Sequence, residues 1–406
     1  MKIFVLMVLL ISNCYSFEYR FEGDSTIEAR TFKKDRLLQT KDHSISNKTA
    51  IKWRAKHENY SSEIRGFVRK DLSQKSRNVS ILEEFSISYE QNSYEISLGS
   101  KMFNWSALEA FHPVDNINAR NYDSNVESPE KVGQNVLQYT KLIGESIVWD
   151  FYYMPDFRHS KLTKKDSRLG FGGLDFNNYK LYQDDKNSTN SSSKDQWGLR
   201  YQRNFEGGDI SFHYLDFVDK NHFLIQKNGI GLQVLSPSVR QFGGTLQQLF
   251  GEYTFKVEAA YRDYANDTLL KLNNIEDHLQ LALGLEKTLY HDNSQETTFI
   301  AEIQNIFGVN ERVRQSLDFF QRDILFGFRH SFNDVMGKEL SASIILDLEE
   351  SKQILVSTTW SQRLSDISKI KFHLRYIDAY PNVTAPVGLQ HLNQDHQMML
   401  EYIRYF

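Results

Sequence analysis

Residues 80–100, SILEEFSISYEQNSYEISLGS, alternate apolar and polar side chains on both sides of a turn at 91–92. Successive side chains of an extended chain point to opposite faces, so one face of this stretch is apolar and the other is polar. The apolar face is predicted to carry Ile81, Phe85, Ile87, Tyr89, Tyr94, Ile96 and Leu98, and the polar face Glu84, Ser86, Ser88, Glu95, Ser97 and Gly99. This pattern predicts an antiparallel hairpin with its apolar face outward and its polar face inward.

The same alternation recurs along the chain, for example in residues 146–154 and 196–217, and helical periodicity is nearly absent. The 28 Phe, 21 Tyr and 5 Trp are the aromatic residues that half-apolar strands use. No apolar run reaches the length of a transmembrane helix. We therefore predict an all-β fold, a transmembrane antiparallel up-and-down β-barrel of about 18 strands, with 16 strands as the alternative.

Connections in such barrels alternate between long outer loops and short turns on the other side. Outer loops are predicted at 37–46, 104–143, 182–195, 219–237, 265–278, 309–319 and 380–395, and short turns at 59–60, 91–92, 207–208, 251 and 364–366, with a longer turn at 155–167 on the short-turn side. The final strand is predicted in residues 398–406, MMLEYIRYF, where it pairs with the first strand. Tyr402 and Phe406 are its predicted signal to the barrel assembly machinery.

The start of the chain has the features of a secretory signal peptide. Met1 and Lys2 precede an apolar run at 3–11, and small residues suit cleavage before Phe17. Residues 1–16 are thus the predicted signal, and residues 17–406 a single barrel domain. The alternative is a lipoprotein in which Cys14, the only cysteine, is lipidated. In either case the mature chain has no disulfide framework and no cysteine-ligated metal.

The segment between Phe103 and Gly133 is dense in Asn, Asp, Glu and Arg. One interpretation is that it folds into the barrel mouth and forms a constriction; the other is that it caps the outer surface. The candidate constriction residues are Glu109, Asp115, Arg120, Glu127, Glu130 and Lys131. Alternating segments elsewhere give lumen-facing candidates, which are Lys256, Glu258, Arg262, Lys371, His373 and Arg375.

Enzyme and cofactor motifs are weak. The 12 histidines form no metal-binding motif, there is no Gly-X-Ser-X-Gly elbow, and no nucleotide fingerprint is complete. We expect no enzyme activity, no metal and no cofactor. A net charge of −4 gives no basis for binding nucleic acid.

The chain resembles the porin-like outer-membrane β-barrel proteins of Gram-negative bacteria, in particular uncharacterised porin-like families. The resemblance rests on the signal, the strand ending at Phe406, Leu98-Gly99 followed by Trp105, PVDNIN at 113–118, FYYMPDF at 151–157, and the hairpin at 239–264. It implies location in the outer membrane, contact with its lipid, and passive diffusion of small hydrophilic solutes. A homotrimer is one assembly that it allows. The competing hypothesis is a non-conducting barrel that serves as a surface adhesin or structural protein.

Overall fold

The computed structural model describes residues 18–33, 40–163, 167–169, 179–183, 195–221, 224–228, 231–264, 275–349, 353–379, 388–392 and 395–406. The predicted signal at 1–16, Cys14 and much of the predicted loop at 182–195 lie outside this part of the chain. None of the described helices is long and apolar enough to cross a membrane.

Eighteen strands form one sheet. They are β1 (Glu18–Phe32), β2 (His43–His57), β3 (Tyr60–Asp71), β4 (Val79–Gln91), β5 (Tyr94–Lys101), β8 (Gln134–Ile143), β9 (Ile147–Met154), β11 (Gln196–Phe205), β12 (Gly208–Val218), β15 (Ser238–Phe250), β16 (Tyr253–Tyr264), β17 (His278–Tyr290), β18 (Glu296–Phe307), β19 (Arg322–Ser331), β20 (Glu339–Asp347), β21 (Ile354–Ser365), β22 (Ser368–Asp378) and β23 (Gln397–Tyr405). Each pairs antiparallel with the barrel strands before and after it in the chain. The short strands that lie between some of them belong to two smaller sheets and are described below.

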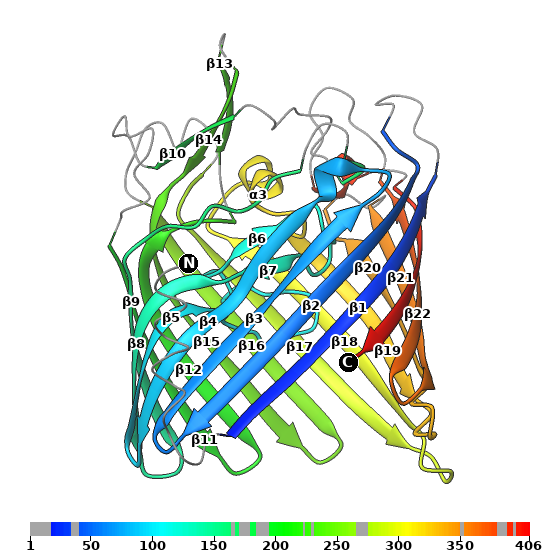
Figure 1. Cartoon of the computed structure of the whole chain (residues 1–406). Helices are drawn as coiled ribbons and strands as arrows, with labels where there is room; N and C mark the ends of the chain where they lie inside the picture. Colours follow the sequence, from blue (N-terminus) through cyan, green and yellow to red (C-terminus); the bar gives the residue numbers. More distant parts are fainter. Residues whose placement is uncertain are drawn as a thin grey trace.

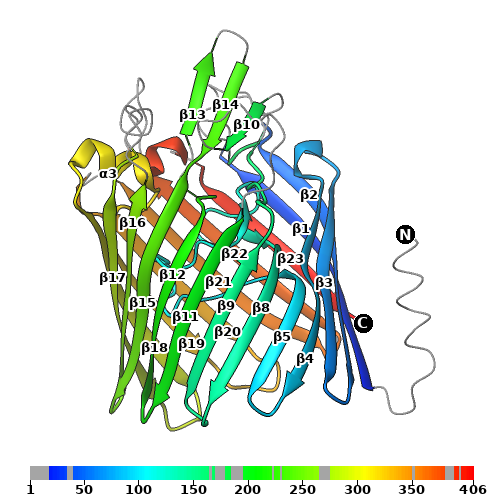
Figure 2. The same cartoon turned by 90° about the vertical axis from the view of Figure 1, so that its left-hand side faces the viewer.

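The sheet closes on itself between β23 and β1, where Asp24 faces Tyr405 and Phe32 faces Gln397 (Figures 1 and 2). Gly23 and Phe406 extend this pairing by exchanging backbone hydrogen bonds of 3.0 and 2.9 Å. Closure leaves no unpaired strand edge, which a structure within lipid requires. The predicted all-β up-and-down barrel is therefore confirmed, with 18 strands.

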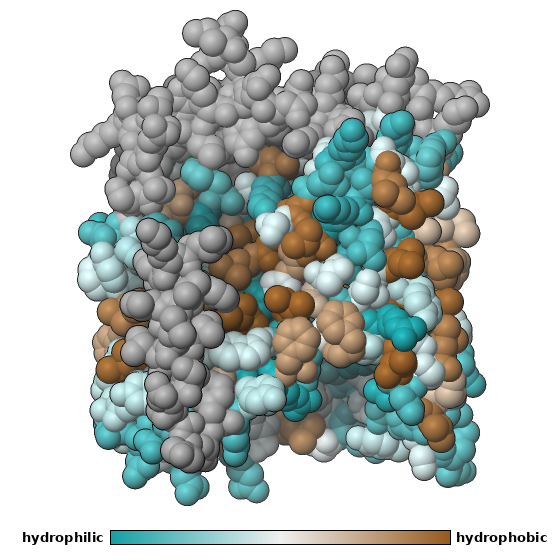
Figure 3. Space-filling model, viewed as in Figure 1, coloured by the Kyte–Doolittle hydropathy of each residue, from teal (hydrophilic) through white to brown (hydrophobic). Residues whose placement is uncertain are grey.

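The outer surface of the barrel is largely apolar. The inner surface is polar, except where wall residues such as Leu215, Leu325 and Ile345 are buried in apolar clusters with residues of the connection at 102–133. Figure 3 shows brown apolar residues across the middle of one face, above a largely teal lower rim. Aromatic rings follow one another across neighbouring strands at the short-turn side: Tyr60–Tyr89, Tyr89–Tyr94, Tyr94–Tyr139 and Tyr139–Phe151 have centroid separations of 4.9, 6.3, 6.1 and 6.2 Å. Such a belt is typical of the level of lipid headgroups.

The hairpin at 80–100 forms β4 and β5, but one of its side chains was assigned to the wrong face. The β3–β4 pairing shifts from Arg65↔Glu84 to Gly66↔Leu82, which leaves Glu83 as a bulge. One extra residue reverses the alternation beyond it. Ile81 is consequently buried inside the barrel rather than exposed with Phe85.

Two predicted connections are wrong because one strand was missed. Residues 134–143, placed in the long loop at 104–143, form β8, and the connection from β5 to β8 is 102–133. β8 turns into β9 at 144–146, so the chain after β9 leaves on the long-loop side. The predicted turn at 155–167 is therefore wrong, because its described residues, 155–163 and 167, belong to an outer connection. The predicted turn at 155–167 and the predicted outer loop at 182–195 would require a barrel strand between them, whereas β9 pairs directly with β11.

The remaining elements lie in connections on the long-loop side. They are the helical turns η1 (Lys75–Arg77) and η3 (Gly388–Leu392), helix α3 (Glu311–Leu317), and the strands β6 (Ala119–Asn121), β7 (Glu130–Val132), β10 (Tyr179–Gln183), β13 (Leu224–Asn228) and β14 (Gly231–Ser236). β10, β14 and β13 form a small sheet that projects beyond the barrel rim (Figure 2). β13 and β14 lie in the predicted loop at 219–237 and are not barrel strands.

Candidate functional site: an inserted segment and the lumen beside it

Residues 102–133, the inserted segment, fold inside the barrel. Their short strands β6 and β7 pair with each other, Ala119 with Val132. Side chains of the segment pack against inward-facing residues of the wall: Phe103 and Trp105 contact Tyr152 with ring centroids 5.4 and 5.7 Å apart. Phe111 is 1% exposed. Of the two interpretations of this segment, the geometry corresponds to insertion.

Two carboxylates on the wall bind the start of the inserted segment. Glu258 of β16 accepts hydrogen bonds from Ser106 Oγ (2.6 Å) and from the backbone N–H groups of 107 and 108 (2.5 and 3.0 Å). Glu302 of β18 accepts from the next three backbone N–H groups, 109 to 111, at 2.6, 3.0 and 3.4 Å. We call Glu258 and Glu302 the anchoring carboxylates. They hold six consecutive residues against the β16–β18 wall.

The middle of the segment binds the same side of the wall through Arg262. Its guanidinium donates to the carbonyl of Pro113 (2.7 Å) and to Gln280 Oε1 (2.9 Å), and the residue is 1% exposed. Asn116 Nδ2 lies 3.2 Å from Gln241 Oε1 of β15. The first half of the segment is thus fixed by side chains of β15, β16 and β18.

The end of the segment contacts the opposite wall. Arg30 of β1 donates to the carbonyl of Ser124 (3.0 Å), and Arg375 of β22 donates to Asn125 Oδ1 (2.9 Å). Arg375 also lies 3.7 Å from the carboxylate of Glu127. The inserted segment therefore crosses the lumen from β16–β18 to β22 and β1.

Three of the predicted constriction residues form a cluster within the segment. Lys131 pairs with the buried carboxylate of Asp115, and Arg120 donates to the carbonyl of Asp115 (2.9 Å) with its guanidinium 3.9 Å from the carboxylate. Burial lowers the pKa of Lys131, although its pairing with Asp115 opposes the shift. These charges hold the segment in shape.

The other constriction candidates lie apart from this cluster. Glu130 accepts from Lys48 Nζ of β2 (3.0 Å) and from Arg69 Nη1 of β3 (3.1 Å). Glu127 lies near Arg375, as described above, and the side chain of Glu109 is exposed. The structure thus distributes the six candidates over one internal cluster, two wall contacts and one exposed side chain.

All six lumen-facing candidates point to the inner surface of the barrel. Glu258 and Arg262 bind the inserted segment, whereas Lys256 pairs with Glu286 of β17 at 2.5 Å. On the other wall, Lys371 lies 4.0 Å from Glu401. His373 Nδ1 lies 2.9 Å from Thr359 Oγ1.

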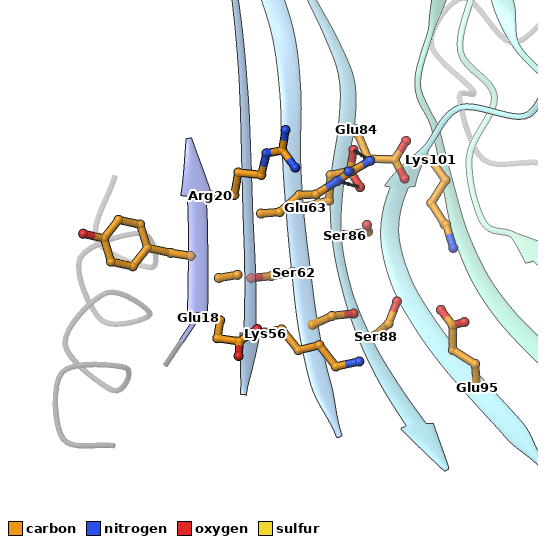
Figure 4. A pocket seen from close by; sticks show the side chains of 14 residues that line it. Glu18, Arg20, Lys56, Ser62, Glu63, Glu84, Ser86, Ser88, Glu95 and Lys101 are labelled. Carbon is orange, nitrogen blue, oxygen red and sulfur yellow. Dashed lines mark hydrogen bonds and ion pairs between the residues drawn. The ribbon is translucent and has the colours of Figure 1, made fainter. Parts of the chain in front are cut away.

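Two cavities lie on the β22–β23–β1–β5 side of the lumen, and the first of them borders the segment. The first, of about 400 Å³, separates residues 124–130 of the segment from inward-facing side chains of β1, β2, β22 and β23, including Lys48, Lys371 and Glu401. The second, of about 500 Å³, is lined by β1–β5 towards the short-turn side and is drawn in Figure 4. Both are bordered mainly by charged side chains and hydroxyls, so water and polar solutes suit them.

His112 is a further titratable group of the segment. Burial, reinforced by the nearby Arg120, lowers its pKa to about 4, and its Nδ1 lies 2.6 Å from Ser106 Oγ. It is therefore neutral at pH 7. In the described part of the chain, no three His, Cys, Asp or Glu side chains are placed to hold a metal ion.

No protein-family model matches the sequence, and no curated protein matches it. Solved structures do match the fold. OccD3 (OpdP) of Pseudomonas aeruginosa gives a TM-score of 0.53 at 10% identity, covering 96% of this chain and 91% of that one. OccAB1 and OccAB3 of Acinetobacter baumannii each give 0.54 at 8% identity, covering 96% and 98% of this chain and 96% and 100% of theirs. The likeness shows the fold: this chain is a closed 18-strand antiparallel β-barrel, similar in fold to these three structures.

In this barrel, several residues that shape the lumen were not among the sequence candidates. They are Glu302, Arg30, Arg69 and Lys48. Each lies at an inward position of an alternating strand, so extending the alternation test to β1, β2, β3 and β18 would have included them. The sequence gives no signal for which of them meets the inserted segment, because that segment is irregular.

Proposed function

We propose that this barrel is a channel for passive diffusion of small hydrophilic solutes across the outer membrane. The observation that carries the proposal is the inserted segment, which crosses the lumen and leaves a charged cavity between its end and β22, β23, β1 and β2. A segment that only capped the outside would not need anchoring carboxylates on inward positions of the wall. A narrow, polar, ion-lined passage selects solutes by size and charge.

Lys371 is the residue best placed to test the passage. It lines the first cavity, is 39% exposed and lies at the limit of an ion pair with Glu401. Lys371→Glu changes the charge on the cavity wall by two units, and it removes no buried contact of Lys371. Lys287 of β17 is a matched control, because it belongs to neither cavity and donates to Tyr253 Oη (3.2 Å) on an exposed part of the barrel.

The experiment is reconstitution of the folded, full-length protein into planar bilayers. Wild type is expected to give stepwise conductance, and Lys371→Glu is expected to shift the reversal potential in a KCl gradient towards cation selectivity. Lys287→Glu should leave it unchanged. Heat-modifiable protein with no conductance steps would refute the channel and favour the non-conducting barrel.

We propose further roles alongside the channel. Residues 1–16 act as a signal peptide and residues 17–406 as one domain. Tyr402 and Phe406 form the signal for barrel assembly. The six constriction candidates and the six lumen-facing candidates together set the width and field of the passage. A homotrimer is the assembly that we propose to look for by cross-linking.

A further inference from the structure

Two outer connections, the one after β9 and the one after β12, contact the inserted segment. Lys161 of the first connection lies beside β6: its N–H donates to the carbonyl of Arg120 (2.8 Å), and its carbonyl accepts from the N–H of Tyr122 (3.0 Å). Ser160 Oγ also accepts from the N–H of Arg120 (3.0 Å). The first connection thus extends the β6–β7 pair by a parallel bridge between Asn121 and Lys161.

The connection after β12 contacts the segment through residues 219–221, which we call the latch. Lys220 Nζ donates to the carbonyl of Ile117 and to Gln134 Oε1, the latter at 2.8 Å. The carbonyl of Lys220 accepts from Ser160 Oγ at 3.0 Å. Lys220 therefore joins the segment, the start of β8 and the connection after β9 at one place.

The other two residues of the latch lie close to the constriction candidates. Asn221 Nδ2 donates to Asn116 Oδ1 at 2.7 Å, and the N–H of Asn221 donates to Asp219 Oδ1 at 2.9 Å. Asp219 Oδ2 accepts from Tyr264 Oη of β16 at 2.8 Å. Asn116 directly follows Asp115, which belongs to the cluster of constriction candidates. The latch thus contacts the segment next to charged groups that we expect to set the field of the passage.

The burial of Lys220 opposes closure of the latch. The residue is 1% exposed, both acceptors of its ammonium group are uncharged oxygens, and no described carboxylate forms an ion pair with it. Burial lowers the pKa of Lys220 to about 7, although Asp156 and Asp219 oppose the shift. A buried cation without an ion pair carries a desolvation cost that hydrogen bonds to neutral groups offset only in part. Release of the ammonium group into water recovers that cost.

The two connections meet a second time in the projecting sheet. β10 belongs to the connection after β9, and β13 and β14 belong to the connection after β12. β10 pairs with β14 in parallel, Tyr179 with Leu232, and the sheet stands beyond the barrel rim (Figure 2). The connections are thus joined both in the sheet and at the contact of Ser160 with Lys220. Because the covalent chain links these two places, a displacement of the sheet acts on the latch.

We propose that the latch couples the projecting sheet to the inserted segment and so regulates the passage. When the latch is closed, the middle of the segment is held at residues 116–122 and the passage is narrow. When the sheet is displaced, Lys220 and Asn221 leave the segment, whose start stays fixed by the anchoring carboxylates, and the passage widens. This inference rests on the proposed channel and adds its regulation.

The test joins β10 to β14 covalently in the full-length protein. Lys180 and Gln233 are cross-strand partners, and neighbouring strands lie about 4.8 Å apart, which a disulfide can bridge. Cys14, the only native cysteine, lies in the predicted signal, so Lys180→Cys/Gln233→Cys introduces the only cysteine pair in residues 17–406. In planar bilayers, the oxidised pair should hold the latch closed and reduce transitions to a larger conductance level about fivefold. Dithiothreitol should restore the wild-type frequency.

Two comparisons test whether the latch is the route of coupling. Lys220→Met removes both hydrogen bonds of the ammonium group. Its channels, checked for folding by heat modifiability, should visit the larger level more often and should no longer respond to the disulfide. The matched control is Asn204→Cys/Asp209→Cys, a cross-strand pair of β11 and β12 at the short-turn side. Its oxidation and reduction should leave the transitions unchanged.

The outcomes separate this regulation from the channel itself. Equal transition frequencies in oxidised and reduced Lys180→Cys/Gln233→Cys channels would overturn the latch and leave the channel intact. An undiminished response in the Lys220→Met background, or an equal response in the control pair, would also overturn it, because the sheet would not act through the latch. So would failure of Cys residues at 180 and 233 to join, since β10 and β14 would then not pair. If folded wild type gives no conductance steps, both proposals fail.

Discussion

Removing one anchoring carboxylate tests the position of the inserted segment directly. Glu302→Ala deletes the acceptor of three consecutive backbone N–H bonds at 2.6, 3.0 and 3.4 Å. Hydrogen bonds to a charged partner contribute roughly 1.5–3 kcal/mol each, but lumen water can replace part of this. A loss of roughly 3–5 kcal/mol in docking of the segment is the expected result. The barrel itself loses no ladder hydrogen bond, because the backbone of β18 is unchanged.

A docking loss of this size is comparable to the free energy of a local unfolding transition. The start of the segment should therefore leave the wall for a measurable fraction of time. In planar bilayers this predicts larger conductance steps with more open-channel noise than wild type. Limited trypsin digestion should also cleave faster after Arg120 and Lys131, which lie in the segment.

Glu286→Ala is the control for this experiment. Glu286 lies on the neighbouring strand β17, also faces inward and pairs with Lys256 rather than with the segment. It should change conductance only slightly and leave trypsin cleavage as in wild type. Glu302→Gln should fall between, since it keeps one oxygen acceptor. If Glu302→Ala matches Glu286→Ala in both assays, the segment does not depend on this anchor and the reasoning is wrong.

Three further predictions concern single positions. Gly23→Val should slow assembly, measured as heat-modifiable protein over time, because a Cβ at 23 would lie 2.3 Å from the ring of Phe406; normal assembly would contradict the seam geometry. Acid should loosen the segment, because the pKa of His112 in the folded protein, about 4, is below the ordinary histidine value of 6.5. The stabilising contribution of neutral His112 is complete above pH 6.5, and roughly 3 kcal/mol of it is lost as the pH falls towards 4. Amide hydrogen exchange of the segment, corrected for the intrinsic rate at each pH, should rise over that range in wild type and less in His112→Gln. Phe111→Ala should undock the segment by about 3–5 kcal/mol, because Phe111 is buried with its ring 6.0 Å from that of Phe320, and protease protection equal to that of wild type would refute this.

The barrel could be predicted because its strands obey one local rule. Alternation in β4, β5, β9, β11 and β12 is strong enough to see without any knowledge of the neighbours. The rule failed where the backbone departs from regular pleating. The bulge at Glu83 moved Ile81 from the lipid face to the lumen, where it packs with Phe67 and Val132. No feature of residues 81–84 alone marks that bulge, because the partner strand fixes the register.

β8 was missed for a different reason. Its outward positions include Leu137 and Tyr139, but its inward positions mix Val136 with Gln138 and Thr140. Val136 is buried because the inserted segment covers it. The apolar side chain on the inner face blurred the alternation that identifies a strand. The same segment that fills the lumen thus obscured the strand beside it.

The position of the inserted segment follows from two carboxylates of the wall that have no positively charged cross-strand neighbour. The cross-strand neighbours of Glu258 are Thr245 and Ala282, and those of Glu302 are Gly284 and Leu325, so none carries a positive charge. Two inward carboxylates without cationic neighbours need hydrogen-bond donors from elsewhere.

Gly284, on the strand between the two carboxylates, shows where those donors come from. A Cβ at this position would lie 2.4 Å from Leu108 Cδ2, so the absence of a side chain leaves the space that the segment occupies. Unpaired inward carboxylates on either side of an inward glycine are therefore a pattern that predicts insertion, provided that the strand register is known. Register is what a single sequence does not supply, because it depends on which strands pair and where bulges fall. The barrel strands can thus be predicted one at a time, each from its own residues. The inserted segment can be placed only when it is known which residues lie side by side on three neighbouring strands.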